Sequence, residues 1–245
     1  MINILSSNAA SASDSFNEDP RIEGEDNLDW LTRNLQDLSS DKVTPLAMVG
    51  GVDRTSFRLR VAQSHLRDDL APGHWSHVFM LGKVGKRVGS TSVYEISLEP
   101  EGGFGFPPPT NGVQEGRLDR YRDPVKYPNI AVAGVPVPRA EVMKALERFK
   151  KQRGVLDTVD LVLRWLAFAW GASRSGNPLL EGQGIPSAAM LEVVVGASGF
   201  DLTPGLESRS SCPEAIWQAA KWWHEYYQRD KREPLRGAFW VAHKL

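Results

Sequence analysis

The spacing of apolar residues changes near the middle of this chain, and that change constrains its fold more than any other feature. Between about residues 57 and 137, apolar residues alternate with polar ones or form short continuous runs, as they do in β-strands. From residue 139 to 229 they recur at helical spacing. Strands followed by helices are typical of an α+β domain, which is the predicted fold class.

Several short segments of the first half are predicted to be strands. Residues 57–61 alternate between apolar and charged side chains, and residues 92–98 alternate again. Residues 77–82 form a continuous apolar run that ends at a glycine, which indicates a central strand. Residues 83–90 are basic and contain two glycines, so they are predicted to join two of these strands as a hairpin. A further β-branched run covers residues 130–137.

Helices are predicted in the second half and near the start of the chain. The first is a short amphipathic helix that Asp26 can cap, and it can dock on its own domain or on a partner. The segment 157–172 is apolar almost all round, so we expect it to be largely buried. The other predicted helices cover residues 139–152, 186–199 and 213–229.

Two boundaries follow from these patterns. Residues 1–43 are predicted to form a disordered tail plus the short helix, and residues 44–245 to form the main domain. Residues 99–128 are rich in glycine, proline and charge, and so predict a long loop. That loop either covers a substrate cleft or packs locally on the surface.

Composition favours a soluble protein over a nucleic-acid-binding or membrane-spanning one. Hydrophobic residues make up 41% of the 245 residues, enough for a sizeable core, and the net charge is -1 without a basic block. No apolar run approaches the roughly 20 residues that span a bilayer. Residues 1–16 hold no basic residue and no apolar run, so a cytoplasmic protein without a secretory signal is expected.

Cys212 is the single cysteine, which excludes an internal disulfide and a cysteine-based zinc site. Pro213 suits the first position of a helix, so Cys212 falls at the N-cap. Unpaired backbone N–H groups and the helix dipole at that position favour the thiolate and lower the pKa of a thiol. The alternative is a buried, unreactive cysteine.

A nucleophilic thiolate needs an imidazole, and His77 is the leading candidate among five histidines. It opens the predicted central strand, where a strand end can present a side chain into a cleft. Glu95 lies in the next predicted strand and can orient His77 if the two strands pair closely. His74, three residues before His77, is a secondary candidate for that role.

These residues carry a family resemblance. The patterns Ser76-His77-Val78 and Cys212-Pro213-Glu214, with Gly199-Phe200-Asp201-Leu202 before the cysteine, resemble the circularly permuted NlpC-type papain-like superfamily, including its lecithin:retinol acyltransferase-like branch. The histidine precedes the cysteine, as in the permuted members. Phe79 and Pro213 depart from the glycine and serine that the family often has there. The resemblance implies an antiparallel sheet packed against helices, with a helical insertion at about residues 139–199.

The resemblance also implies a function. It predicts a cysteine hydrolase (peptidase or amidase) in which His77 activates Cys212 to attack an amide or ester carbonyl through a thioester, with Glu95 or His74 orienting His77. A peptide or acyl substrate and no metal or organic cofactor are expected. A thiol acyltransferase is an alternative. Another is an inactive papain-like module that binds a protein through the N-terminal helix or the loop 99–128.

Overall fold

The computed structural model describes residues 17–98, 110–152, 157–172, 175–230 and 235–242, which form a mixed seven-stranded sheet covered by helices. This arrangement confirms the α+β class. Neighbouring strands are antiparallel, except that β1 and β7 are parallel. In spatial order the strands are β1 (Asn17–Glu18), β7 (Gly237–Trp240), β6 (Asn129–Val135), β2 (Thr44–Gly50), β3 (His77–Leu81), β4 (Ser92–Glu95) and β5 (Gln114–Arg117).

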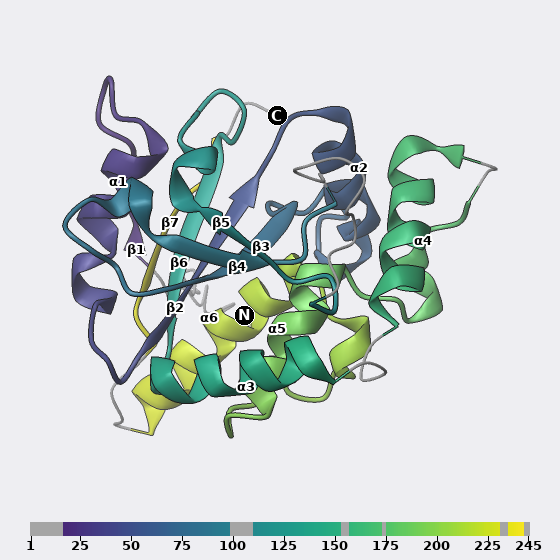
Figure 1. The fold of residues 1–245 in the computed structure, drawn as a ribbon. Helices are drawn as coiled ribbons and strands as arrows, with labels where there is room; N and C mark the ends of the chain where they lie inside the picture. The colour runs from purple at the N-terminus through teal and green to yellow at the C-terminus, as the bar shows by residue number, and fades with distance from the viewer. Residues whose placement is uncertain (1–16, 99–109, 153–156, 173–174, 231–234, 243–245) are drawn as a thin grey trace, which may run out of the picture.

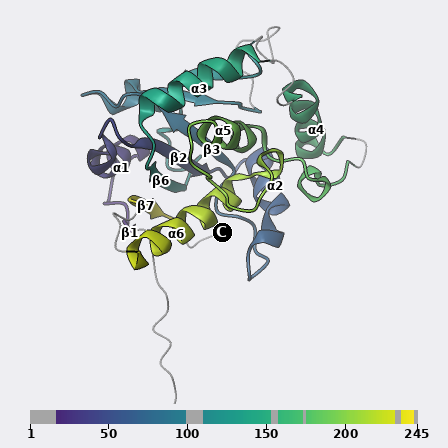
Figure 2. The ribbon, with the colours of Figure 1, turned by 90° about the horizontal axis from the view of Figure 1, so that it is seen from below.

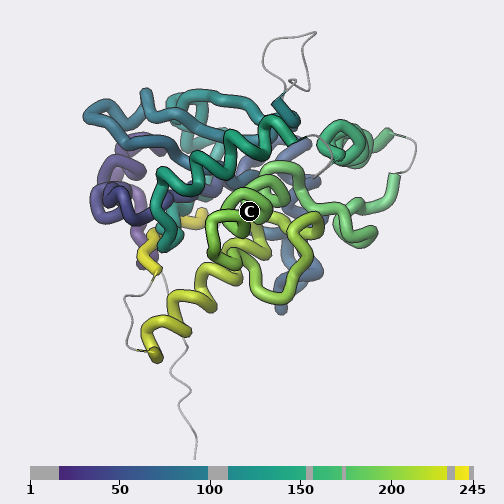
Figure 3. Tube along the Cα trace, turned by 60° about the horizontal axis from the view of Figure 1, so that its bottom comes forward, coloured from purple at the N-terminus to yellow at the C-terminus, as the bar shows by residue number. Residues whose placement is uncertain are grey.

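The helices lie on both sides of this sheet. Helix α1 lies on one side, and α3, α5 and α6 lie on the other (Figures 1 and 2), where their traces gather in teal to yellow in Figure 3. Helix α4 stands at the margin of the molecule and contacts α2 and α5. The helices are α1 (Asn27–Asn34), α2 (Arg54–Ala62), α3 (Arg139–Lys151), α4 (Thr158–Trp170), α5 (Pro186–Gly196) and α6 (Pro213–Arg229).

The sheet separates two hydrophobic cores. Because side chains of a strand alternate between its faces, Val78 and Met80 of β3 belong to the core shared with α5 and α6. Phe79 and Leu81 belong to the core under α1. The same alternation places His77 on the face of Phe79, away from α5 and α6.

Most predicted elements are confirmed, among them the hairpin of β3 and β4 and the helix that Asp26 caps. The strand predicted at residues 57–61 is wrong, because this segment lies within helix α2. Asp53 caps the first turn of α2, accepting a hydrogen bond from the backbone N–H of Ser56. Leu59 is buried, whereas Phe57 and Val61 are exposed, so the alternating pattern does not reflect two faces of a strand.

Helix α4 is less buried than its composition predicts. Val162 and Trp165 are buried in the core, but Val159, Leu163 and Trp170 on its other side are exposed. The prediction that this helix is largely buried is therefore wrong for one of its faces. In the described part of the chain, no helix combines the length and the apolar character needed to cross a membrane.

The short helix before residue 44 docks on its own domain. Strand β1 pairs with β7, and α1 packs on the same sheet as the rest of the chain. Residues 139–199 supply α3, α4 and α5, which line one core and are not peripheral to it. Of the predicted loop and tail, residues 99–109 and 1–16 lie outside the described residues. Within residues 110–128 the structure has β5 and a 3-10 helix, η5 (Leu118–Tyr121).

Leu46 tests the central packing of the sheet, because it lies on β2 between β3 and β6 and is fully buried. We expect Leu46→Ala to lower the free energy of unfolding by about 2–5 kcal/mol through lost apolar contacts and the cavity left behind. Val125→Ala, at an exposed position, should change it by less than about 0.5 kcal/mol. Urea denaturation measures both, and equal effects of the two substitutions would contradict the assigned core.

Candidate functional site

The structure brings His77 and Glu95 together at one end of the β3–β4 hairpin. Glu95 lies on the same face as His77 and opposite Phe79 in the register that pairs Met80 with Tyr94. The distance from His77 Nε2 to Glu95 Oε2 is 2.5 Å. Because the ionised carboxylate only accepts hydrogen bonds, Nε2 carries the proton, and Nδ1 is the ring nitrogen left for another partner.

The Glu95 carboxylate is fully buried and is held from two further directions. Arg120 Nη1 donates to Oε1 at 2.6 Å, and the Tyr121 hydroxyl donates to Oε2 at 2.5 Å. Burial acts to raise the pKa of Glu95, but the hydrogen bond and charge of His77, then the charge of Arg120 and the Tyr121 hydroxyl, outweigh it. The pKa of Glu95 therefore lies below its ordinary value, and the side chain is a carboxylate.

Tyr121 also positions the imidazole by packing against it. Its ring stacks on His77 with centroids 6.1 Å apart and on Phe79 with centroids 4.5 Å apart. Burial, followed by the Glu95 charge, raises the pKa of Tyr121 well above its ordinary value, so the phenol stays neutral and donates its proton. Arg120 and Tyr121 lie in the segment predicted as a loop, and no local motif marks them as site residues.

His77 lies at a small pocket, and its side chain is 16% exposed. The pocket has a cavity volume of about 40 Å³, room for on the order of three water molecules. Hydroxyl groups line part of it, from Thr55 and Ser56 in the first turn of α2 and from Ser76 and Ser97, and apolar side chains line another part. Ser76 already accepts from the Gly51 N–H and donates to the Val49 carbonyl. The pocket thus surrounds His77 with both polar and apolar groups, and it admits water or one end of a substrate.

Cys212 is the N-cap of α6, as predicted, but the structure does not place it with His77. It is fully buried in the core of α5 and α6, and His77 faces the other core. Burial raises the pKa of Cys212 to about 12; the charge of Glu214 adds to this, and the Ala215 N–H does not offset it. The expectation that the N-cap lowers the pKa of this thiol is therefore wrong, because burial outweighs the helix terminus.

A buried carboxyl group lies close to Cys212. Glu192 of α5 is 5% exposed, and its Oε1 accepts hydrogen bonds from the hydroxyls of Thr203 and Ser211. Burial raises the pKa of Glu192 to about 7, with a smaller contribution from the Asp201 charge, and the two hydroxyls act in the opposite direction. Glu192 makes no ion pair with a described basic residue, which is why these hydroxyls do not restore an ordinary pKa.

His74, the secondary candidate, does not orient His77. Its Nε2 lies against Arg67 Nη1, and its backbone N–H donates to Glu214 Oε2 at 2.9 Å. Burial lowers the pKa of His74 to about 4, and Arg67 and Arg60 add to this effect. This imidazole is neutral and belongs to the ionic cluster around Glu214, at the start of α6.

Comparisons with protein-family models, with curated proteins and with solved structures each found no match to this chain. The predicted superfamily therefore stays a prediction, and the chemistry of the site rests on its geometry. Within the ranges that the structure describes, no group of His, Cys, Asp and Glu side chains has the arrangement to hold a metal ion.

A double-mutant cycle tests the hydrogen bond between Tyr121 and Glu95. Tyr121→Phe keeps the stacked ring and removes one donor to a buried charge, so we expect it to lower the free energy of unfolding by about 1.5–3 kcal/mol. In a Glu95→Gln background the same change should cost at least about 0.5 kcal/mol less, because the acceptor is no longer charged. Additive effects in thermal or urea unfolding would contradict a direct contact.

Glu192 predicts a pH dependence of stability. A carboxyl whose pKa is raised to about 7 by folding contributes stability that is fully present below its unfolded value and is lost as pH rises through about 7. Relative to Glu192→Gln, the wild type should therefore lose about 3 kcal/mol between roughly pH 4 and pH 8. Urea unfolding of both proteins across this range measures it, and a constant difference would show that Glu192 titrates normally.

Proposed function

We propose that this protein is a hydrolase in which His77, oriented by Glu95, acts as general base and general acid on an ester or amide carbonyl. The observation that carries the proposal is the 2.5 Å contact between His77 and a buried carboxylate, at a pocket lined with both hydroxyl and apolar groups. An imidazole held in one tautomer by a carboxylate is the arrangement that acid–base catalysis uses. Cys212 takes no part in this reaction.

The proposed reaction uses water as the nucleophile. Nδ1 of His77 accepts a proton from a water molecule while the water oxygen attacks the carbonyl carbon. The imidazolium that forms is stabilised by the adjacent Glu95 carboxylate, whose own position is fixed by Arg120 and Tyr121. The tetrahedral intermediate then collapses with cleavage of the carbonyl C–O or C–N bond. His77 gives the proton to the departing alcohol or amine, and the carboxylic acid is the second product.

The pocket is electrostatically suited to the negative charge that develops on the carbonyl oxygen. Helix α2 begins beside it, and Thr55 and Ser56 from its first turn line the wall. The positive end of a helix dipole favours an anion within about one turn of the N-terminus. The same feature favours an ester or amide over a substrate that develops positive charge.

The cysteine hydrolase and thiol acyltransferase interpretations stay predictions. Both require Cys212 to leave its buried position and reach His77 from the other side of the sheet. A non-catalytic interaction module is the alternative from another class, and in it the His77–Glu95 pair would only stabilise the hairpin. In the proposed hydrolase, activity depends on His77 and not on Cys212. In the cysteine enzymes it depends on both residues, and in the interaction module there is no activity.

Hydrolysis of p-nitrophenyl acetate separates these functions. We expect the wild type to hydrolyse this ester above the buffer rate, and His77→Gln to lower the enzymatic rate by about 100-fold or more. Cys212→Ser is the matched control, since it changes a buried thiol to a hydroxyl, and it should leave the rate within about threefold of the wild type.

Two other outcomes would contradict the proposal. Loss of activity in Cys212→Ser, together with wild-type labelling by iodoacetamide well below pH 8 that His77→Ala abolishes, would establish the cysteine hydrolase instead. A rate that is the same in the wild type and His77→Gln would leave the pair without a catalytic role and favour the interaction module. Circular dichroism of each variant confirms that the fold is retained.

A further inference from the structure

The pocket at His77 receives side chains from both hydrophobic cores. Tyr121 and Tyr127, which line it beside His77, belong to the core under α1. The aliphatic side chains that line it belong to the core of α5 and α6, and they are Leu59, Ile96, Leu98 and Ile185. The imidazole therefore reaches the pocket from the side of α1, and an aliphatic wall closes it on the side of α5.

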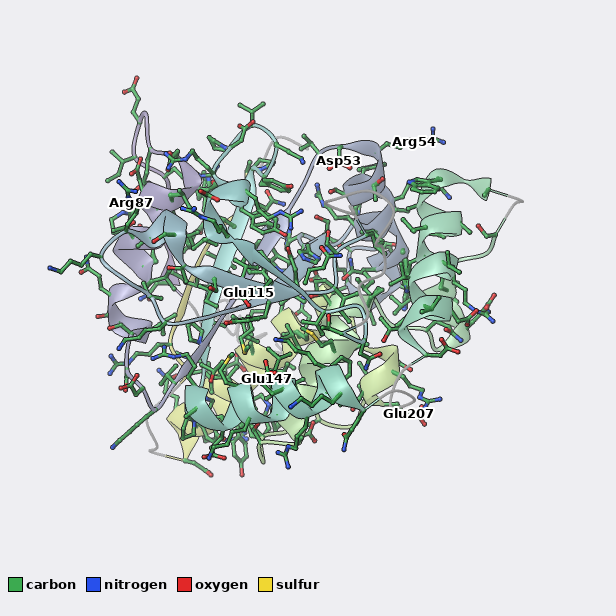
Figure 4. All side chains as sticks on the ribbon, in the orientation of Figure 1. Asp53, Arg54, Arg87, Glu115, Glu147 and Glu207 are labelled. Carbon is green, nitrogen blue, oxygen red and sulfur yellow. The ribbon has the colours of Figure 1, made fainter. Side chains whose placement is uncertain are left out.

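Helix α2 gives the pocket a direction from polar to apolar. Thr55 and Ser56 in its first turn contribute hydroxyl groups, and Leu59, four residues after Thr55, contributes an aliphatic side chain. Residues four apart lie on the same face of a helix, with Cβ atoms about 5–6 Å apart. Figure 4 labels Asp53 and Arg54, which mark the polar start of this helix.

The Thr55 hydroxyl is the group on this helix that can receive a carbonyl oxygen. Ser56 Oγ already donates to Asp53 Oδ2 at 2.6 Å. Thr55 Oγ1, in contrast, has no hydrogen-bond partner in the part of the chain that the structure describes. A carbonyl oxygen that accepts from Thr55 lies at the positive end of the α2 dipole, and its alkyl chain then extends along the helix towards Leu59.

The aliphatic wall is fixed by its own packing and hydrogen bonds. Ile96 and Ile185 are each 1% exposed, and Leu59 is 6% exposed. The Ser187 hydroxyl accepts a hydrogen bond from the Ile96 N–H and donates to the Val78 carbonyl, which ties the wall to β3 and α5. Side chains in a close-packed core do not move aside without cost, so the wall limits how far an alkyl chain can extend.

The volume of the pocket sets that limit. About 40 Å³ holds roughly three non-hydrogen atoms when each takes about 10–15 Å³. An acetyl group has three, namely the carbonyl carbon, its oxygen and one methyl carbon. We propose that the pocket selects esters or amides of acetyl and similarly short, unbranched acyl groups, an inference that rests on the hydrolase proposed above. Leu59, Ile96 and Ile185 determine this specificity, because a longer chain would overlap them.

Hydrolysis of p-nitrophenyl acetate, butyrate and hexanoate tests the limit on chain length. We expect kcat/KM of the wild type to fall at least about tenfold from acetate to butyrate. Ile185→Val removes a methyl group from the wall and should raise the butyrate-to-acetate ratio at least about fivefold. Ile216→Val is the matched control, since Ile216 is buried in the same core outside the pocket, and it should leave this ratio unchanged.

The outcomes separate this inference from the hydrolase itself. Equal kcat/KM across the three esters, or the same ratio in Ile185→Val and Ile216→Val, would overturn the limit on chain length and leave the hydrolase in place. Failure to hydrolyse any of the three esters would contradict the hydrolase, and the pocket is then tested by binding alone.

Binding of acetamide and hexanamide tests the pocket without catalysis. In the protein labelled with nitrogen-15 in its histidine rings, we expect acetamide to shift the His77 signals and hexanamide at the same concentration not to do so. In Leu59→Ala, and to a smaller degree in Ile185→Val, hexanamide should shift them too, because the wall recedes. A wild type that responds equally to both amides, or that does not respond to acetamide, would overturn the proposal. Circular dichroism confirms that each variant is folded.

Discussion

The site and the local fold around it both depend on one buried charge, the Glu95 carboxylate. An ionised carboxyl group that is fully removed from water is costly unless several donors compensate it. Here the donors come from two other segments, since His77 opens β3 and Arg120 and Tyr121 lie in η5. The hydrogen bonds to Glu95 therefore hold η5 against the hairpin. The imidazole of His77 is held by its hydrogen bond to Glu95 and by the stacked ring of Tyr121. The same hydrogen bonds stabilise the local fold and hold the imidazole in the orientation that the proposed reaction uses.

The sheet imposes a second constraint, because it separates the side chains on one of its faces from those on the other. Side chains of β3 alternate, so His77 shares a face with Phe79 and Glu95, and Cys212 lies in the core beyond the other face. A reaction at His77 must use a nucleophile that enters its pocket. Water meets that requirement without rearrangement of the fold, whereas the Cys212 thiol does not.

Sequence patterns predicted the elements that have a strong local signal. Such signals predicted β3 from its apolar run and the later helices from their spacing. They also predicted the helix starts that follow Asp26 and Cys212. Residues 57–61 were predicted to be a strand because apolar and charged residues alternate there. They lie in a helix, in which Leu59 is buried and Phe57 is exposed. Over only five residues, the spacing of apolar side chains does not distinguish a strand from a helix.

The candidate site was predicted only in part, because a local sequence pattern marks some of its residues and not others. His77 and Glu95 were found because each lies in a recognisable strand, and hairpin pairing brings neighbouring strands together. Arg120 and Tyr121 were not found, because their role comes from a tertiary contact in a segment without periodicity. The burial of Cys212 also depends on how α5 and α6 pack, which the sequence around Pro213 does not encode locally.

The central claim is that Glu95 holds His77 with its proton on Nε2 and leaves Nδ1 free to act as a base. Nuclear magnetic resonance of the protein labelled with nitrogen-15 in its histidine rings measures this directly. The account predicts that the neutral His77 ring carries its proton on Nε2, with a downfield proton signal protected from exchange that is lost in Glu95→Gln. A proton on Nδ1, or a ring that samples both tautomers in the wild type, would contradict it.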